Sequence, residues 1–250
     1  MRSTAYIFAF VAAMTFVVAL VLSLMAVGLK PIHDKNEAIF NKKAVLAAIE
    51  SELGENVKAD KLPDDEVLEI FNNRIEQTVI DFNGNTVSAE DVESRGYRGG
   101  LAEHVDMKKE KKKDAEERIF PLFQYKNGSE TYYIVTVRGN GLWDEIWGNI
   151  ALKDDLSTIV GASFDHAGET PGLGAEIKDN AAWKRQFQGK SLFDKSGNYT
   201  SVYVRKGGSR NQTFEVDGIS GATVTCDGVS DMLYDGIQYY LPYLETLKKT

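Results

Sequence analysis

The sequence has few of the residues that build disulfides and metal centres. Its 250 residues include one cysteine, Cys226, and three histidines, His33, His104 and His166. A single cysteine excludes an intrachain disulfide and any cysteine-ligated zinc or iron–sulfur site built by this chain alone. The histidines lie far apart and lack the spacing of zinc ligands. We therefore predict that the chain holds no metal.

An excess of basic residues is also missing. The chain has 29 Lys and Arg against 37 Asp and Glu, which gives a formal net charge of −8. Because a nucleic-acid site needs a basic footprint, this balance argues against a nucleic-acid partner. The hydrophobic share of 43% suffices for a packed core, and the length favours one or two domains.

The N-terminal region carries a long uncharged apolar run. Residues 5–29 contain no charged side chain. About 25 residues form a helix of roughly 37 Å, which exceeds the ~30 Å hydrocarbon thickness of a bilayer. A cleaved signal peptide would have a shorter apolar region and a small-residue cleavage site, and neither fits well. We predict a transmembrane helix over residues 5–29, preceded by a short N-terminus (1–4) and ended by Pro31.

The charges that flank this run do not decide its orientation. Arg2 precedes it, and Lys30 and Lys35 follow it. Lys and Arg in short flanking segments set the orientation of a membrane helix, and here they stand on both sides. Charge alone therefore leaves the side of the membrane open.

The rest of the chain has the pattern of an α+β domain. Apolar spacing predicts an amphipathic helix over Lys35–Leu53 and a helix over Pro63–Ile75, so residues 30–62 are expected to form a helical connector and residues 63–250 the domain. A final helix is expected over Asp227–Lys249, bent near Pro242. Alternating apolar residues and turn signals predict strands, several of them antiparallel, over Thr78–Phe82, Ile119–Tyr125, Tyr132–Arg138, Ile146–Leu152, Ser157–Phe164, Val202–Arg205 and Thr213–Val216.

A charge-dense run, KKEKKKDAEER, covers Lys108–Arg118. A basic cluster can contact phosphates or anionic lipid. Here acidic residues are interleaved and no aromatic residue appears, which favours a solvated helical or loop face.

The segment Asp217–Thr225 (DGISGATVT) is a small-residue turn between a predicted strand and the final helix. Gly218 and Gly221 permit a close approach to the backbone, and the start of a helix favours a phosphate. An N-cap in which the hydroxyls satisfy the helix start fits these residues equally well. From the residues alone both interpretations stay open.

This segment resembles the flavinylation motif Asp-x-x-(Ser/Thr)-Gly-Ala-Thr of bacterial FMN-binding domains. In that family a flavin transferase takes FMN from FAD and esterifies its phosphate to the hydroxyl of the last threonine. The resemblance implies covalent FMN at Thr223, with the cofactor site extending over Asp217, Ser220, Gly221 and Ala222. Thr225 is a second hydroxyl nearby.

Two further segments strengthen the resemblance. The stretch Glu-Thr-Pro-Gly-Leu-Gly resembles the flavin-embracing loop of the C subunit of the bacterial sodium-translocating NADH:quinone reductase and of the related Rnf complex G subunit. The stretch Gly139–Trp143 resembles the Gly-x-Gly loop of that family, although a core tryptophan is an equal alternative for Trp143. The resemblance adds these expected cofactor-binding residues: Glu169, Thr170, Gly172, Leu173, Gly174, Gly141, Leu142, Trp143 and, with the least support, Lys206.

Two reactive side chains lie near these segments. Cys226 follows Thr223 by three residues, but without a partner cysteine a structural thiol is favoured over a redox role. His166 precedes the second loop, where a hydrogen bond to backbone is favoured over proton donation to the flavin.

The resemblance implies an electron carrier without independent catalysis. It predicts a subunit of a six-subunit membrane complex that oxidises NADH, reduces ubiquinone and moves sodium, with the B, D and E subunits as partners. It also predicts an inner-membrane protein with a cytoplasmic N-terminus, one membrane span and a periplasmic domain. Three alternatives stay open: an Rnf-type G subunit, a membrane-anchored binding or sensor domain without flavin, and an anchored hydrolase. The hydrolase would use Ser220 or Thr223 as nucleophile, yet the sequence has no Gly-x-Ser-x-Gly or Ser-x-x-Lys motif.

Overall fold

The computed structural model describes residues 3–248, and its first element is a long helix, α1 (Thr4–Ala47). Within it the apolar run has a mean hydropathy of 2.7, long and apolar enough to cross a membrane. The helix was predicted correctly, but its predicted end at Pro31 is wrong, because α1 continues through this residue. A proline inside a helix removes one hydrogen bond, and packing of the following turns can offset that loss.

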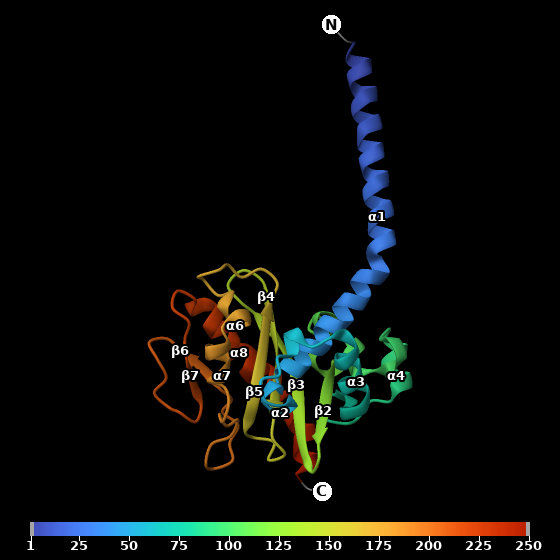
Figure 1. Cartoon of the computed structure of the whole chain (residues 1–250). Coiled ribbons are helices and arrows are strands. Elements are labelled where there is room, and N and C mark those ends of the chain that lie inside the picture. Colours follow the sequence, from blue (N-terminus) through green and yellow to red (C-terminus); the bar gives the residue numbers. More distant parts are fainter. Residues whose placement is uncertain (1–2, 249–250) are drawn as a thin grey trace. The chain divides into compact units, whose positions relative to one another are not determined.

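The chain divides into two compact units between Phe40 and Asn41. In the first unit the side chains of residues 3–38 are exposed, as expected for a helix whose surroundings are lipid. The second unit holds all the strands and the remaining helices (Figure 1). It starts well before residue 63, where the sequence placed the domain boundary.

A five-stranded sheet forms the centre of the second unit. Its strands are arranged in chain order, and each pairs antiparallel with the next. This confirms the α+β class and the predicted antiparallel sheet. The strands are β1 (Ile75–Asp81), β2 (Ile119–Asn127), β3 (Glu130–Asn140), β4 (Glu145–Leu152) and β5 (Ile159–His166).

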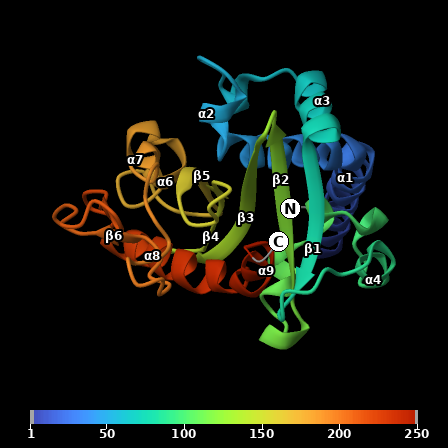
Figure 2. The same ribbon diagram turned by 90° about the horizontal axis from the view of Figure 1, so that it is seen from below.

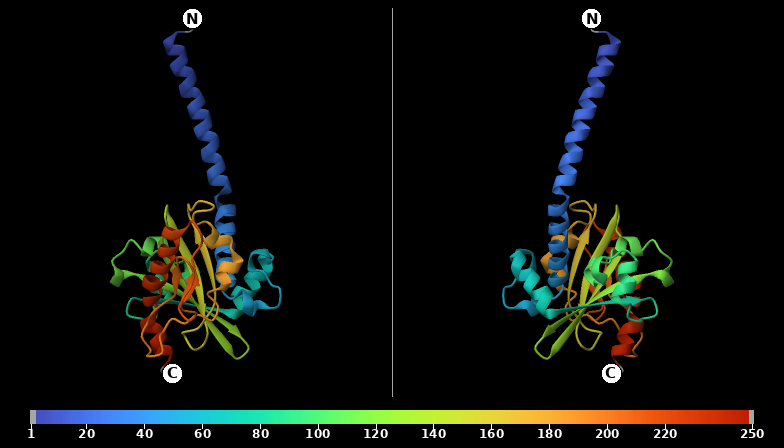
Figure 3. Two further views of the ribbon diagram at one scale, coloured as in Figure 1. Left: turned by 90° about the vertical axis from the view of Figure 1, so that its left-hand side faces the viewer. Right: turned by 90° about the vertical axis from the view of Figure 1, so that its right-hand side faces the viewer.

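Helices cover both faces of this sheet, as Figures 2 and 3 show from below and from the two sides. One face carries α8 (Thr223–Gln238) and α9 (Leu241–Leu247), which together form the predicted C-terminal helix bent next to Pro242. The other face carries the end of α1 together with α2 (Glu50–Leu53) and α3 (Asp64–Arg74). Two apolar cores result, one on each side of the sheet.

The end of α1 belongs to the core of the second unit. Leu46 in the last turn of α1 and Ile49 just after the helix have no exposed surface. The Ser163 hydroxyl donates to the Ala44 carbonyl at 2.7 Å, and Lys42 forms an ion pair with Glu103. Residues 41–53, which the sequence assigned to a connector, therefore contribute to the core of the domain.

Close contact with β3 defines the packing of α8. A Cβ at Gly228 would lie 2.2 Å from the Asn140 carbonyl oxygen, and one at Gly236 would lie 2.8 Å from a methyl of Val137. These glycines let the helix backbone approach the strand closely. As a consequence, the first turns of α8 lie directly over the end of β3.

This contact makes a prediction about Gly228. In most helices a change from glycine to alanine stabilises by up to about 1 kcal/mol. At Gly228 the added methyl meets a backbone oxygen, and we expect Gly228→Ala to destabilise the domain by about 1–3 kcal/mol. Denaturant unfolding measures the change. An unfolding free energy of Gly228→Ala equal to or above that of the wild type would contradict the expectation.

The remaining elements are short. The predicted strands near residues 202–216 are present as β6 (Tyr203–Arg205) and β7 (Glu215–Asp217), but they pair in parallel in a separate sheet. After β1 the chain turns back, and Ile80 pairs with Thr86 in an isolated antiparallel bridge. The other elements are α4 (Ala89–Ser94), α5 (Met107–Glu110), α6 (Glu176–Asp179), α7 (Ala181–Arg185), η1 (Ala59–Lys61), η2 (Arg98–Gly100), η3 (Ala102–His104) and η4 (Ala115–Glu117).

The charged run 108–118 is not a uniformly solvated face, and that prediction is wrong for Glu110. Glu110 is fully buried and accepts hydrogen bonds from Tyr97, from Lys113 at 2.6 Å and from the Ile119 N–H at 3.0 Å. Within the same run the Lys111 ammonium donates to the Asn140 side chain at 2.6 Å. A buried carboxylate with several donors fastens this segment to the domain.

Candidate functional site

The turn between β7 and α8 presents an uncapped helix start. Gly221 has φ +83°, and a Cβ there would lie 2.8 Å from the Gly172 carbonyl oxygen. Helix α8 begins at Thr223 after Ala222, and across residues 3–248 no side chain caps it. The interpretation of Ser220, Thr223 and Thr225 as capping hydroxyls is therefore wrong. The first N–H groups and the positive end of the helix dipole are left for an anion.

The two threonines at this helix start have different environments. Thr225 has no exposed surface, and its hydroxyl donates to Glu169 Oε2 at 2.5 Å and lies 3.3 Å from the Leu173 carbonyl oxygen. Thr223 is half-buried, and among the described residues nothing hydrogen-bonds its hydroxyl. Of the two threonine hydroxyls, that of Thr223 is therefore the one left without a hydrogen-bond partner in the described chain.

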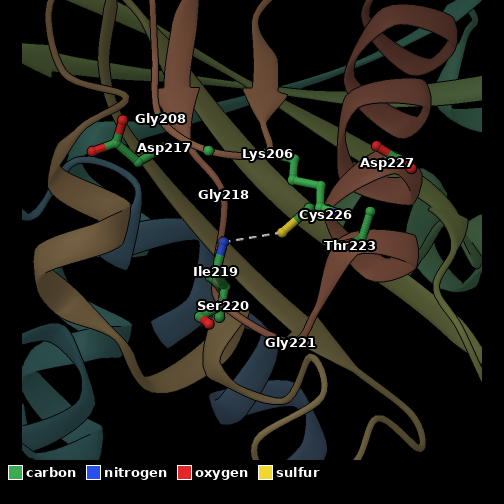
Figure 4. A pocket seen from close by; sticks show the side chains of 11 residues that line it. Lys206, Gly208, Asp217, Gly218, Ile219, Ser220, Gly221, Thr223, Cys226 and Asp227 are labelled. Atoms are coloured by element: carbon green, nitrogen blue, oxygen red, sulfur yellow. Dashed lines mark hydrogen bonds between the residues drawn. The ribbon is translucent and has the colours of Figure 1, made fainter.

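Thr223 faces an open hollow of about 510 Å³ (Figure 4). Two charged residues that line the hollow, Lys206 and Asp227, lie on either side of Thr223 in Figure 4. The lining residues are Lys206, Gly207, Gly208, Asp217, Gly218, Ile219, Ser220, Gly221, Thr223, Cys226 and Asp227. Five predicted cofactor residues thus meet at one hollow: Thr223, Ser220, Gly221, Asp217 and Lys206.

The polar side chains among these five residues have different environments. The Asp217 carboxylate accepts from the Ser209 N–H at 2.7 Å, which ties the loop after β6 to the end of β7. Lys206 and Ser220 are exposed. The remaining predicted residue of the motif, Ala222, is buried and does not line the hollow.

Cys226 and His166 have the roles that the sequence favoured. The Cys226 thiol is buried, which raises its pKa, and it accepts a hydrogen bond from the Ile219 N–H at 3.3 Å. A thiol held in this way is a poor nucleophile. His166 Nδ1 accepts from the Glu169 N–H at 3.1 Å, so this ring nitrogen orders the loop backbone.

The loop Glu169–Gly174 lies against the start of α8. Leu173 is 42% exposed, whereas Gly174 is buried, and a Cβ at Gly174 would lie 2.4 Å from the Thr225 hydroxyl oxygen. Glu176 fastens the outer side of the loop by accepting from the N–H groups of Gly172 and Gly174 at 2.5 and 3.2 Å. Thr170 and Gly172 occupy the exposed part of the loop.

The Gly-x-Gly loop between β3 and β4 joins the same site. Trp143 is 67% exposed, so the alternative of a core tryptophan is wrong. Leu142 beside it is 39% exposed, and Val224 on α8 is 52% exposed. We name the exposed side chains of Leu142, Trp143, Leu173 and Val224 the apolar rim. Val224 was not among the predicted site residues, although its position next to Thr223 at the start of the expected final helix was a usable signal.

Hydrogen bonds control the charge of the buried Glu169. Burial raises the pKa of its carboxyl, but donation by the Thr225 hydroxyl and by the N–H groups of Trp143, Asp144 and Leu142 outweighs burial and lowers this pKa below the ordinary value. Glu169 is therefore ionised at neutral pH.

Carboxylates whose pKa is lowered in the folded state make the stability of the fold sensitive to acid. Asp155, in the turn between β4 and β5, also has a lowered pKa: burial raises it, but hydrogen bonds from Thr158 and Ser157 prevail. A carboxylate with a lower pKa in the folded state stabilises the fold above its unfolded pKa of about 4, and this stabilisation is lost as pH falls through the folded value. We expect the unfolding free energy to fall below about pH 4, with a shallower slope in Asp155→Asn. Denaturant titrations over a pH series measure both slopes, and identical slopes would contradict this origin.

Comparison with known proteins identifies the family of the chain. The model of the FMN-binding domain family matches residues 141–238, a range that starts at the second glycine of the Gly-x-Gly loop and contains the loop Glu169–Gly174 and the turn before α8. The C subunit of the Na⁺-translocating NADH-quinone reductase of Pseudomonas aeruginosa is 33% identical, with 92% of this chain and 95% of that protein covered. The chain belongs to the family of these reductase C subunits.

Other members of this family agree over similar lengths. The C subunit from Neisseria meningitidis serogroup A is 32% identical over 95% of this chain and 92% of that protein. The crystal structure of the C subunit from Parabacteroides distasonis superposes with a TM-score of 0.71 at 34% identity, covering 86% of this chain and 96% of that one. Shewanella oneidensis NqrC gives 0.61 at 26%, covering 86% and 98%. Membership of a membrane reductase family and the apolar helix α1 together fit a membrane-anchored protein.

Proposed function

We propose that this chain is an electron-carrier subunit whose FMN is joined by a phosphoester to Thr223. One observation carries the proposal: α8 starts without a cap, and the half-buried Thr223 hydroxyl at that start has no hydrogen-bond partner in the described chain, whereas Thr225 is buried against Glu169. The family match over residues 141–238 supports FMN as the ligand.

The chain supplies the nucleophile for this attachment. In the proposed step the Thr223 oxygen forms a bond to the FMN phosphorus and loses its proton. The bond between that phosphorus and the AMP part of FAD breaks, and AMP leaves. A flavin transferase provides the FAD and the catalysis. The N–H groups at the start of α8 then face the resulting phosphodiester, whose negative charge suits the helix N-terminus.

The surroundings of Thr223 suit both the ring system and the phosphate end of FMN. The apolar rim offers one tryptophan and three aliphatic side chains for a flat ring system to pack on. Lys206, on the hollow, adds a cation beside the anionic end. Once attached, FMN supplies the redox chemistry, and the protein contributes its position and electrostatics.

The names of the relatives support a place in a larger complex. They are C subunits of Na⁺-translocating NADH-quinone reductases, and this favours the reductase over an Rnf-type complex. We propose that this chain relays electrons in a six-subunit inner-membrane complex that oxidises NADH, reduces ubiquinone and pumps sodium. In this proposal the domain is periplasmic, and its neighbours are the B, D and E subunits.

Coexpression tests the proposal. The full chain is produced with and without a bacterial flavin transferase, denatured, and separated on a gel that is viewed for flavin fluorescence. We expect a fluorescent band only with the transferase, because a phosphoester survives denaturation. A protein that stays colourless with an active transferase would favour a membrane-anchored domain without flavin.

A further inference from the structure

Glu169 is a buried carboxylate that joins the three loops of the site. It is 5% exposed and does not line the hollow at Thr223. Its Oε1 accepts from the Trp143 N–H at 2.9 Å and lies 3.4 Å from the Asp144 nitrogen. Its Oε2 accepts from the Thr225 hydroxyl at 2.5 Å. One side chain therefore connects the Gly-x-Gly loop to the start of α8.

Two glycines make room for this carboxylate. A Cβ at Gly141 would lie 2.5 Å from Glu169 Oε1, and a Cβ at Gly174 would lie 2.8 Å from Oε2. Larger residues at these positions would displace the carboxylate or the loops. The glycines of the two loops and Glu169 thus form one packing unit.

The negative charge of Glu169 has no cationic partner. Among the ion pairs of residues 3–248 none includes Glu169, and its partners are backbone N–H groups and one hydroxyl. Neutral donors satisfy the hydrogen bonds of a carboxylate but leave its net charge in place. Because the site is buried, solvent and salt screen this charge weakly.

We propose that Glu169 is a positioning residue for the flavin, and this inference rests on the proposed function. Through the Trp143 amide and the Thr225 hydroxyl it holds Leu142, Trp143 and Leu173 beside Thr223, and its charge opposes the gain of electrons by a flavin resting on these loops. Glu169 does not itself contact the flavin. Removing the charge should therefore loosen the Gly-x-Gly loop and raise the midpoint potential of the flavin.

Glu169→Gln tests both consequences, because it removes the charge and keeps the shape. In the flavin-free protein we expect the amides of Trp143 and Asp144 to exchange hydrogen about tenfold faster or more. In the flavin-loaded protein we expect a more positive midpoint potential in a spectroelectrochemical titration. Asp155→Asn is the matched control, since Asp155 also accepts N–H groups, from Ser157 and Thr158 at 2.8 and 2.7 Å, but in another turn. It should leave both measurements unchanged.

Thr225 variants test the same link from α8. Thr225→Val keeps a similar side-chain volume but removes the hydroxyl that donates to Glu169, and it should speed hydrogen exchange of the Trp143 amide. Thr225→Ser keeps the donor and should exchange at the wild-type rate. Unchanged exchange in both Glu169→Gln and Thr225→Val, or an unchanged potential in loaded Glu169→Gln, would overturn the inference. Failure of the wild-type chain to take up flavin would instead refute the proposed function, while the exchange measurements would still report on the loops.

Discussion

Replacing Thr223 by alanine should abolish covalent flavin attachment, whereas Thr225→Ser should leave it at the wild-type level. The half-buried Thr223 carries a hydroxyl without a hydrogen-bond partner in the described chain at the uncapped start of α8, and Thr225 is buried with its hydroxyl engaged by Glu169. Without the Thr223 oxygen no phosphoester can form at this position. Flavin fluorescence per mole of denatured protein, after coexpression with the transferase, measures the effect.

Two controls separate chemistry from folding in this experiment. Thr223→Ser keeps a hydroxyl and should retain flavin, which shows that the transferase still recognises the site. Circular dichroism of Thr223→Ala should match that of the wild type, because the half-buried Thr223 side chain makes no hydrogen bond in the described chain. Full labelling of a folded Thr223→Ala protein would move the attachment site to another residue.

Removing residues 41–53, which comprise the end of α1 and the whole of α2, should prevent the domain from folding. A chain that starts at Asn41 keeps the whole second unit and should unfold cooperatively. A chain that starts at Gly54 lacks Val45, Leu46, Ala48 and Ile49, all of them buried in the core on the α3 side of the sheet. Full burial of a large aliphatic side chain contributes about 1.5–3 kcal/mol, so their joint loss approaches the ~5–15 kcal/mol stability of a typical domain.

Thermal unfolding followed by circular dichroism distinguishes the two shortened chains. We expect a sigmoidal transition for the chain from Asn41 and none for the chain from Gly54. Leu46→Ala in the longer chain is a milder version, expected to cost about 2–5 kcal/mol because this fully buried residue would leave a cavity. Equal transitions for both shortened chains would show that residues 41–53 are not needed for the domain to fold and serve only as the connector predicted from the sequence.

Local sequence patterns predicted where helices and strands lie better than which distant segments they contact. Apolar residues that alternate with period 2 located the strands around Phe123, Val135 and Ile150. The pattern is visible in the local sequence because these side chains point into one of the two cores. The continuation of α1 past Pro31 was missed, since the side chains that hold its last turns come from distant segments, such as Ser163. The burial of Glu110 was missed for the same reason: Tyr97 and Ile119, which satisfy it, lie outside the charged run.

A short motif was sufficient to point to the candidate site. The resemblance pointed to Thr223, and the structure brings Ser220, Gly221 and Lys206 to the same hollow. The hydrogen bond between Thr225 and Glu169 spans 56 residues and follows from no local pattern. It matters because it separates two neighbouring threonines that the sequence leaves chemically equivalent.

The most direct measurement is fragmentation mass spectrometry of the peptide that contains both threonines, taken from protein matured with the flavin transferase. If FMN is esterified to Thr223, fragments that include Thr223 carry an added mass equal to FMN less one water, and fragments that contain Thr225 alone are unmodified. An added mass on Thr225 or Ser220, or a peptide without any addition, would contradict it.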